Sequence, residues 1–438
     1  MTADATAGHT GCAWPSHSSC TVLRVPAVVP FVTPPHSRRA VLAAAGVAVS
    51  GLTLAGCLGS DTGDGPAGDA SDATADTGRA GQSEGPTSPR GTGVTSGAST
   101  TAAASVDALP TRDDPLPVHY TFAHIRDRTT PGGPPKDGIP SIDDPAFESA
   151  AAASEWLDPG DVVFGVARGN DVRAYPQRIL VHHEIANDTV DGENVSVTYC
   201  PLTGTAMGFF RGETTFGVSG DLVNSNLVMY DRATDSRWPQ VMATAVSGPF
   251  RGQSLTEFPV TWTSFERWRA VHPDTVVLSR DTGFVRNYNN DPYGAYNPPR
   301  GYYVNTHTLF PPLTRDGPVT YNPKRVVVGV REPGGAVVGF LESAVRERGV
   351  LTGVSNGTEV VAVYDPSLDT VRTYRNPERR SVEPAPDSEA GSGTDAGGVV
   401  VDGEPVAVDE LPLEPVLGFD AMWFAWTRIY PESVIVTR

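Results

Sequence analysis

The sequence predicts an α+β protein dominated by strands and built from two tandem copies of one β-rich unit. The chain holds 46 Gly and 39 Pro among its 438 residues, which favours a loop-rich body over a helical bundle. Short β-branched runs are bounded by Gly, Asn and Asp, as strands usually are. Long amphipathic helices are missing from the pattern, so parallel β-α-β winding is disfavoured.

An internal repeat predicts the two units. Three pairs of segments match in order, namely 161–166 with 325–330, 195–201 with 360–366, and 265–276 with 423–434. Self-similarity of this kind indicates that one structural unit is used twice. We therefore expect a first unit at 110–280, a connector rich in Tyr, Pro and Asn at 281–324, and a second unit at 325–438.

Local signals predict the elements of each unit. Hairpin turns are expected at 188–192 and 355–357, where Asp-Gly and Asn-Gly pairs separate two strand-like runs. A helical turn is expected at 177–184. Each unit then closes with a short Trp-containing helix and a final strand. The low-complexity stretch at about 380–400 predicts a mobile loop inside the second unit.

The N-terminal segment predicts export. Ser37-Arg-Arg-Ala is followed by a weakly apolar stretch and then by Leu-Ala-Gly-Cys57, and this order resembles a twin-arginine lipoprotein signal. We expect residues 1–56 to be the signal, with a misassigned translation start, because 36 residues precede Ser37. Cys57 would carry the lipid and anchor the protein to the outer face of the cytoplasmic membrane.

Residues 57–109 predict a disordered tether. After Cys57 this segment consists mainly of Gly, Ala, Ser, Thr and Asp, so it cannot bury enough apolar surface to offset its ordering entropy. The membrane, reached through the lipid on Cys57, is the partner that the sequence predicts.

The charge balance excludes one class of partner. The formal net charge is −18, and only two lysines are present, Lys136 and Lys324. A basic nucleic-acid footprint is therefore absent. An acidic, lysine-poor surface is typical of a halophilic protein that stays hydrated in salt.

Cys200 is the first candidate for chemistry. Cys12 and Cys20 precede the signal and Cys57 takes the lipid, so Cys200 is the lone thiol of the mature chain and has no disulfide partner. It ends a strand-like run before a proline, a usual place for a presented side chain. With His183 as base it could act as a nucleophile. A small buried side chain is the structural alternative.

The same residues suggest a metal alternative. Cys200 with His183 or His182, and with Glu184 or Met229, could suit copper or zinc. No Cys-x-x-Cys or His-x-x-x-His spacing accompanies them, and no strong motif requires a cofactor.

A second group of candidates would hold a small ligand. Residues 219–226 alternate glycine with small polar side chains and predict a loop in which Ser219, Asn224 and Asn226 orient the ligand. Asp231, Arg232 and Trp238 could contribute, or could form a structural ion pair capped by an aromatic ring. The connector carries five tyrosines that could cover a cleft between the units, namely Tyr288, Tyr293, Tyr296, Tyr302 and Tyr303.

Several motifs resemble one family. The segments 137–145, 173–176, 182–188, 198–206 and 216–240 closely resemble the domain of unknown function 3179 family, from about residue 137 to the C-terminus. The resemblance implies no established activity. Members often carry a second cysteine where this chain has Thr203, so an obligatory two-cysteine site is not expected. The second half lacks the family's Asp-x-x-Thr-Gly-Ser-x-Trp element, which indicates a degenerate second unit.

Three functions follow as hypotheses. The leading one is a thiol-based enzyme whose site lies in the first unit, because Asp365 occupies the place of Cys200 in the second unit. The alternatives are a metal- or solute-binding lipoprotein without turnover, and a structural surface protein.

Overall fold

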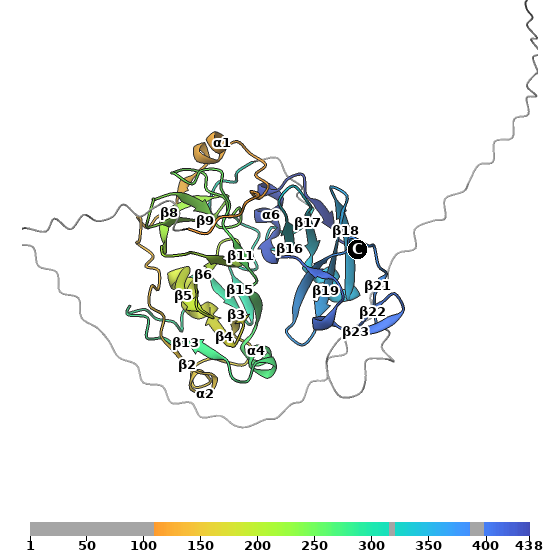
Figure 1. The fold of residues 1–438 in the computed structure, drawn as a ribbon. Coiled ribbons are helices and arrows are strands. Elements are labelled where there is room, and N and C mark those ends of the chain that lie inside the picture. Colours follow the sequence, from red (N-terminus) through yellow and green to blue (C-terminus); the bar gives the residue numbers. More distant parts are fainter. Residues whose placement is uncertain (1–108, 315–319, 386–397) are drawn as a thin grey trace, which may run out of the picture. The chain divides into compact units, whose positions relative to one another are not determined.

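The computed structural model describes residues 109–314, 320–385 and 398–438. Strands dominate this part of the chain, as predicted (Figure 1). Its α-helices have seven residues or fewer, and none is long and apolar enough to cross a membrane. The helices are α1 Phe122–Asp127, α2 Ala150–Ala153, α3 Gln177–His183, α4 Phe265–Val271, α5 Glu342–Arg348 and α6 Trp423–Ile429, with a 3₁₀ turn at Val408–Glu410. The predicted signal, lipid site and tether lie outside the described residues.

The first half contains a five-stranded sheet in the order β12-β3-β4-β13-β2. Neighbouring strands run antiparallel except β4 and β13, which are parallel. Helix α4 connects β12 to β13, which explains how two sequential strands come to lie at separate places in the sheet. The strands are β2 Phe147–Ser149, β3 Val162–Arg168, β4 Asp171–Pro176, β12 Thr261–Ser264 and β13 Val276–Leu278.

The second half contains a four-stranded sheet whose order and strand directions match those of β12-β3-β4-β13. Its strands follow the order β25-β16-β17-β26, with only β17 and β26 parallel, and α6 connects β25 to β26. The tandem repeat suggested by the sequence stays a prediction. The strands are β16 Val326–Arg331, β17 Val337–Leu341, β25 Gly418–Met422 and β26 Val434–Val436.

A tryptophan on the closing helix packs over a glycine in each half. A Cβ atom added to Gly165 would overlap the ring of Trp268, and one added to Gly329 would overlap the ring of Trp426. Both tryptophans are fully buried. The Gly-Val pairs of the repeat therefore serve close packing between a strand and a helix.

Each half adds a second antiparallel sheet. The orders are β11-β7-β6-β5 and β18-β19-β20-β24. The predicted hairpins are present, with positive φ at both turn residues, Asp191 and Gly192 in one and Asn356 and Gly357 in the other. The strands are β5 Ile185–Val190, β6 Glu193–Cys200, β7 Thr205–Phe210, β11 Glu257–Phe258, β18 Val350–Ser355, β19 Thr358–Asp365, β20 Thr370–Arg375 and β24 Glu414–Pro415.

A third sheet in the first half corrects one prediction. Residues 219–223 were expected to lie in a loop, but they belong to β8, which bulges between Val218 and Leu222. Only Asn224 and Ser225 form the turn. Alternating glycine and polar residues misled the prediction because they fit an irregular strand equally well. The sheet has the order β1-β8-β9-β10, with β1 Thr130–Pro131, β8 Phe216–Val223, β9 Asn226–Asp231 and β10 Arg237–Pro239.

The remaining strands are small additions. In the second half β21 Val382–Pro384, β22 Gly398–Val401 and β23 Glu404–Ala407 form a three-stranded sheet. Residues 386–397, the centre of the predicted mobile loop, lie outside the described residues. The connector forms a hairpin of β14 Gly294–Tyr296 and β15 Pro299–Gly301.

Side chains of both halves share one core. Met207 and Trp238 belong to the same hydrophobic cluster as Trp423 and Trp426. A buried ion pair also joins the halves, since Arg331 on β16 donates two hydrogen bonds of 2.9 Å to the carboxylate of Glu257 on β11. The connector and both halves therefore meet around the candidate sites.

Candidate functional site

Cys200 is buried at the end of β6. Its side chain is 1% exposed. The thiol donates toward the Ser225 carbonyl at 3.6 Å and accepts the Leu227 N–H at 3.3 Å. Burial raises the pKa of Cys200 to about 11, with a further contribution from Glu184. The thiol is therefore protonated at neutral pH and satisfied by the β8–β9 turn.

His183 does not contact Cys200. The imidazole is buried at the end of α3, with Nδ1 2.8 Å from the Pro140 carbonyl and Nε2 2.7 Å from the Tyr288 hydroxyl. Burial lowers the pKa of His183 to about 4, so the ring is neutral. Nδ1 must then donate to Pro140 and Nε2 must accept from Tyr288. The structure thus leaves no imidazole nitrogen for the predicted thiol–imidazole pair.

Glu184 is the residue that comes close to Cys200 instead. It ends α3 in a left-handed conformation, with φ 59° and ψ −26°, which is strained for a glutamate. Its side chain is 6% exposed, and among the described residues the carboxyl has no hydrogen bond or ion pair. Burial raises the pKa of Glu184 to about 8. Burial, together with the nearby Glu184 and Cys200 groups when these are ionised, also raises the pKa of Tyr293.

The candidate ligand residues of β8 and its turn are used by the protein itself. The Ser219 hydroxyl accepts the Asp221 N–H at 3.1 Å. The Asn224 side chain binds backbone groups on two other segments, with the Phe424 and Ala425 carbonyls each at 3.3 Å and the Leu313 N–H at 3.1 Å. Beside it, the buried Ser225 hydroxyl is without a partner.

Asn226 is likewise fully used. Its amide donates to Thr203 Oγ1 at 3.1 Å and to Gln240 Oε1 at 3.0 Å, and its oxygen accepts the Val241 N–H at 2.9 Å. These bonds tie the β8–β9 turn to the Cys-Pro-Leu-Thr turn that follows β6. Asn226 therefore helps to hold the two turns beside Cys200. Both its amide nitrogen and its side-chain oxygen already have protein partners.

Asp231 and Trp238 organise a turn. The buried Asp231 carboxylate accepts hydrogen bonds from the backbone N–H groups of Thr234 and Ser236 and from the Trp238 indole, at 2.6, 3.2 and 3.0 Å respectively. Trp238 is fully buried in the hydrophobic core, where its ring contacts the rings of Phe216 and Phe250. Both residues have the structural role that the sequence left open.

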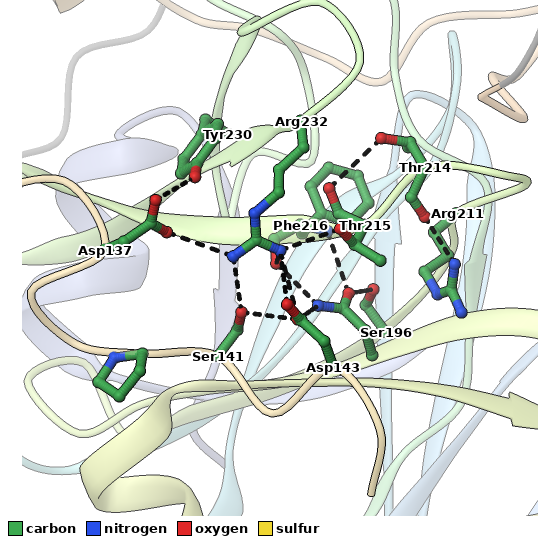
Figure 2. A network of polar contacts seen from close by, with 12 residues as sticks. Asp137, Ser141, Asp143, Ser196, Arg211, Thr214, Thr215, Phe216, Tyr230 and Arg232 are labelled. Atoms are coloured by element: carbon green, nitrogen blue, oxygen red, sulfur yellow. Dashed lines mark hydrogen bonds and ion pairs between the residues drawn. The ribbon is translucent and has the colours of Figure 1, made fainter. Parts of the chain in front are cut away.

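Arg232 pairs with acids far along the chain rather than with Asp231. Figure 2 shows its guanidinium between Asp137, Ser141 and Asp143. The distances to Asp137, Ser141 and Asp143 are 3.3, 3.0 and 3.1 Å. Asp137 also accepts a 2.5 Å hydrogen bond from Tyr230. The predicted Asp231–Arg232 pair is thus replaced by a network that fixes the 137–145 segment onto β9.

The same network reaches the segment around Asn187. The Asn187 amide donates to Asp143 at 2.6 Å and to the Phe216 carbonyl at 2.8 Å, and the Asn187 side-chain oxygen accepts from Ser196 at 2.6 Å. Several of the sequence motifs therefore meet in one structural cluster. Both terminal nitrogens of the Arg232 guanidinium have acceptors in this cluster.

A metal centre is not supported by the donor positions. Among the described residues, no three side chains of His, Cys, Asp or Glu gather closely enough to hold a metal ion. His182 binds the Asn290 carbonyl at 2.9 Å, and Met229 is buried in the hydrophobic core. The copper or zinc set suggested by the sequence is therefore not assembled.

A cavity of about 350 Å³ lies beside the Cys200 region, and we call it the Lys324 cavity. The first half, the connector and the second half all line it. Its aromatic wall is formed by Trp262, Tyr296 and Tyr303, and its charged groups are Lys324, Glu342, Arg346, Asp369 and Asp420. A second cavity of about 240 Å³ shares Trp262, Thr370, Val371 and Asp420 with it.

Lys324 is the unusual side chain of this cavity. It is 7% exposed, and its amine has no hydrogen bond. Nζ lies 3.0 Å from the centre of the Tyr302 ring. Burial lowers the pKa of Lys324 to about 7. The sequence could not single it out, because nothing in its neighbours along the chain indicates burial. Its rarity among 31 arginines was the one available signal.

The connector tyrosines cover the Cys200 segment and reach the cavity. The Tyr302 hydroxyl donates to the Leu202 carbonyl at 2.8 Å. Tyr296 and Tyr303 stack with ring centres 3.9 Å apart, and the Tyr199 hydroxyl donates toward both. The tyrosine-rich segment is therefore a packed wall between the thiol and the cavity.

Comparison with known proteins agrees with the sequence motifs. No curated protein and no solved structure matches the chain. The family model described as "Protein of unknown function (DUF3179)" matches residues 136–433, which is more than half of the chain. The matched region begins at the segment held by Arg232 and ends just before β26. The chain therefore belongs to the DUF3179 family.

Proposed function

We propose that the chain is a binding protein for a small polar solute, which it holds in the Lys324 cavity. The observation that carries this proposal is a cavity of about 350 Å³ whose wall contains a buried amine without a hydrogen-bonding partner. Its volume is in the range of small-ligand sites, and aromatic walls with a few polar groups are typical of them. A bound solute would supply the acceptor that the protein does not.

Binding is tested by thermal unfolding of the full chain against a panel of small charged and neutral solutes. We expect at least one solute to raise the melting temperature in a saturable manner. Thr370 lines both cavities, so Thr370→Phe adds a ring at their shared wall. This variant is expected to abolish the shift in melting temperature while its far-UV circular dichroism spectrum stays unchanged. If no solute on a broad panel shifts the melting temperature, the proposal is wrong.

Tryptophan fluorescence gives a local readout. Trp262 lines both cavities, whereas Trp156 donates to Glu148 and lines neither. Trp262→Phe should remove the solute-induced change in fluorescence, and Trp156→Phe should retain it. A change that survives Trp262→Phe would place the solute elsewhere.

A thiol-based enzyme is the second candidate, and one observation favours it. The Ser225 hydroxyl, buried without a hydrogen bond, belongs to the residue whose carbonyl contacts the Cys200 thiol, and the Glu184 charge contributes to the raised pKa of Cys200. Unused buried polar groups beside a nucleophile type are a usual mark of an active site. The raised pKa of Cys200 argues against it, because the thiolate is the reactive form.

We further propose that the protein is exported and anchored by a lipid on Cys57. The sequence features at 37–57 support this, because the twin arginines, the weakly apolar stretch and Leu-Ala-Gly-Cys57 follow one another as in a lipoprotein signal. Mass spectrometry of the mature chain should find a diacylglyceryl group on Cys57 and no residue before it. Cys57→Ser should release the protein from the membrane fraction. An unmodified Cys57 in a chain that retains its N-terminus would contradict the proposal.

A further inference from the structure

Two ionisable residues that line the Lys324 cavity have no hydrogen bond or ion pair from the described part of the protein. Besides Lys324, Asp420 on β25 lines the cavity, and no hydrogen bond or ion pair engages its carboxyl within the described residues. Lys324 and Asp420 do not pair with each other. The lining thus includes one potential cation, Lys324, whose Nζ packs on the Tyr302 ring, and one potential anion, Asp420.

The other charged groups of the cavity leave both side chains unpaired. Arg346 is held by Glu342 at 2.5 Å and by a close contact with Asp369. Its positive charge is thereby balanced by two acids, so it is not a free partner for Asp420. Glu342 and Asp369 in turn are engaged by Arg346 and do not reach Lys324.

The choice of lysine fits this position. Arginine supplies 31 of the 33 basic residues, yet a lysine occupies the buried site. An arginine cannot lose its proton in a protein, whereas a lysine can rest as a neutral amine when it has no anion nearby. Burial lowers the pKa of Lys324 to about 7 and, with the charge of Glu342, raises the pKa of Asp420 to about 7. Near neutral pH each group is therefore close to the midpoint of its titration and can gain or lose its charge.

We propose that the Lys324 cavity binds a small zwitterion, with its carboxylate on Lys324 and its ammonium group on Asp420. This inference rests on the proposed solute-binding function. A zwitterion compensates both side chains at once, while a simple anion leaves Asp420 unpaired and a simple cation leaves Lys324 unpaired. The faces of Trp262 and Tyr296 add a surface that attracts an ammonium group.

The spacing of the two charges is testable with a homologous series. The probes are the unbranched amino acids from glycine to 6-aminohexanoate, in which methylene groups separate the amine from the carboxylate. The matched controls are carboxylates and alkylamines of the same chain lengths. Binding to the full chain is measured by calorimetry at neutral pH.

We expect one chain length to bind about tenfold or more tightly than either singly charged control, the gain of one charge-assisted hydrogen bond. Lys324→Met and Asp420→Asn should each reduce its affinity to that of the corresponding control. Lys136→Met, the only other lysine change, should leave affinity unaltered. The Lys324→Met chain is expected to fold, because the change removes an unpaired buried amine.

Other outcomes would overturn the inference. Carboxylates that bind as tightly as zwitterions, with no effect of Asp420→Asn, would make the cavity an anion site. Solute binding would then stand and the zwitterion would not. Neutral solutes that bind independently of both side chains would have the same meaning. No binding by any solute would remove the proposed function together with this inference.

Discussion

At position 324 the chain keeps a lysine amine in a buried place without an anion. Removing the amine should stabilise the fold, since burying an unsatisfied polar group costs about 1–3 kcal/mol and a charged one more. We expect Lys324→Met to raise the free energy of unfolding by about that amount at neutral pH. Urea unfolding at pH 7 checks this, with Lys136→Met, whose ammonium pairs with Asp235 at the surface, as a control within about 0.5 kcal/mol of wild type.

The Lys324 amine also makes the free energy of unfolding depend on pH. The pKa of Lys324 is about 7 in the fold and 10.5 ordinarily, so between these values the unfolded chain binds a proton that the folded chain does not. Stability must then rise with pH across this window. The advantage of Lys324→Met should be largest at pH 7 and below, and should shrink toward pH 10. The charged groups that share the cavity are kept in both chains, namely Glu342, Arg346, Asp369 and Asp420. An advantage that grows with pH would contradict the assignment.

Cys200 is expected to react slowly. With a pKa of about 11, about one thiol in a thousand is ionised at pH 8, and only the thiolate is alkylated. Iodoacetamide labelling, followed by mass spectrometry of the Cys200 peptide, should be at least about a hundredfold slower in the fold than in urea. Glu184→Gln should speed labelling near pH 9–10, because the carboxylate charge that raises the pKa of Cys200 is gone.

His183 provides the contrasting variant. Because neither imidazole nitrogen contacts the thiol, His183→Asn should leave the labelling rate at neutral pH unchanged once stability is accounted for. Fast labelling in wild type that slows in this variant would restore the thiol–imidazole hypothesis.

The candidate residues were predictable only in part. The place of Cys200 at a strand end follows from local alternation and the proline after it, and the structure agrees. The importance of Glu184 does not follow, because its left-handed backbone and burial arise from the end of α3 against β6. Lys324 and Asp420 are 96 positions apart, and which side chains face a shared cavity depends on tertiary packing alone.

The packing of α4 on Gly165 and of α6 on Gly329 explains why β3 and β16 each contain a Gly-Val pair. A methyl group at Gly165 must displace the Trp268 ring, so we expect Gly165→Ala to lower the free energy of unfolding by about 1–3 kcal/mol. Gly398→Ala is the matched control, since its added Cβ would meet nothing closer than 3.4 Å. Denaturant unfolding measures both.

A second substitution tests the cause. In the double variant Gly165→Ala, Trp268→Phe, the smaller ring should recover part of the loss, and a double-mutant cycle should give a favourable coupling. Additive losses would mean that the clash with Trp268 is not the source of the effect.

Elements were predicted best where local chemistry decides them. The turns at Asp191-Gly192 and Asn356-Gly357 need positive φ, which those residues adopt readily, so the hairpins could be predicted from a few residues. The segment 219–223 failed because a bulged strand and a loop share the same composition. Its pairing with β9 and β1 depends on partners that local sequence does not reveal.

Across the whole molecule, the four strands β12-β3-β4-β13 of the first half and the four strands β25-β16-β17-β26 of the second half share one order and the same directions, while the tandem repeat suggested by the sequence stays a prediction. What the repeat could not predict is how the halves are joined. That depends on single contacts such as Arg331 with Glu257, whose partners lie 74 positions apart and in different halves. The Lys324 cavity follows from this joining, because its walls come from both halves and the connector.

The Arg331–Glu257 pair should therefore matter for stability and for the cavity. Arg331→Met leaves Glu257 buried without its partner, which is expected to cost about 3–5 kcal/mol. Lys136→Met is the control, because Lys136 pairs with Asp235 at an exposed site and its loss should cost about 1 kcal/mol or less. Arg331→Met with Glu257→Met removes both charges together and should recover most of the loss.

Solute affinity then shows whether the Arg331–Glu257 pair contributes only to stability or also maintains the cavity. If the pair holds the two halves in the arrangement that forms the cavity, Arg331→Met should weaken solute binding even at temperatures where the chain is fully folded, and the double variant should restore it. Hydrogen exchange should rise at β11 and β16, the two strands that carry the pair. Unchanged affinity in a folded Arg331→Met chain would mean that the shared hydrophobic core alone maintains the cavity, and that the ion pair contributes to stability only.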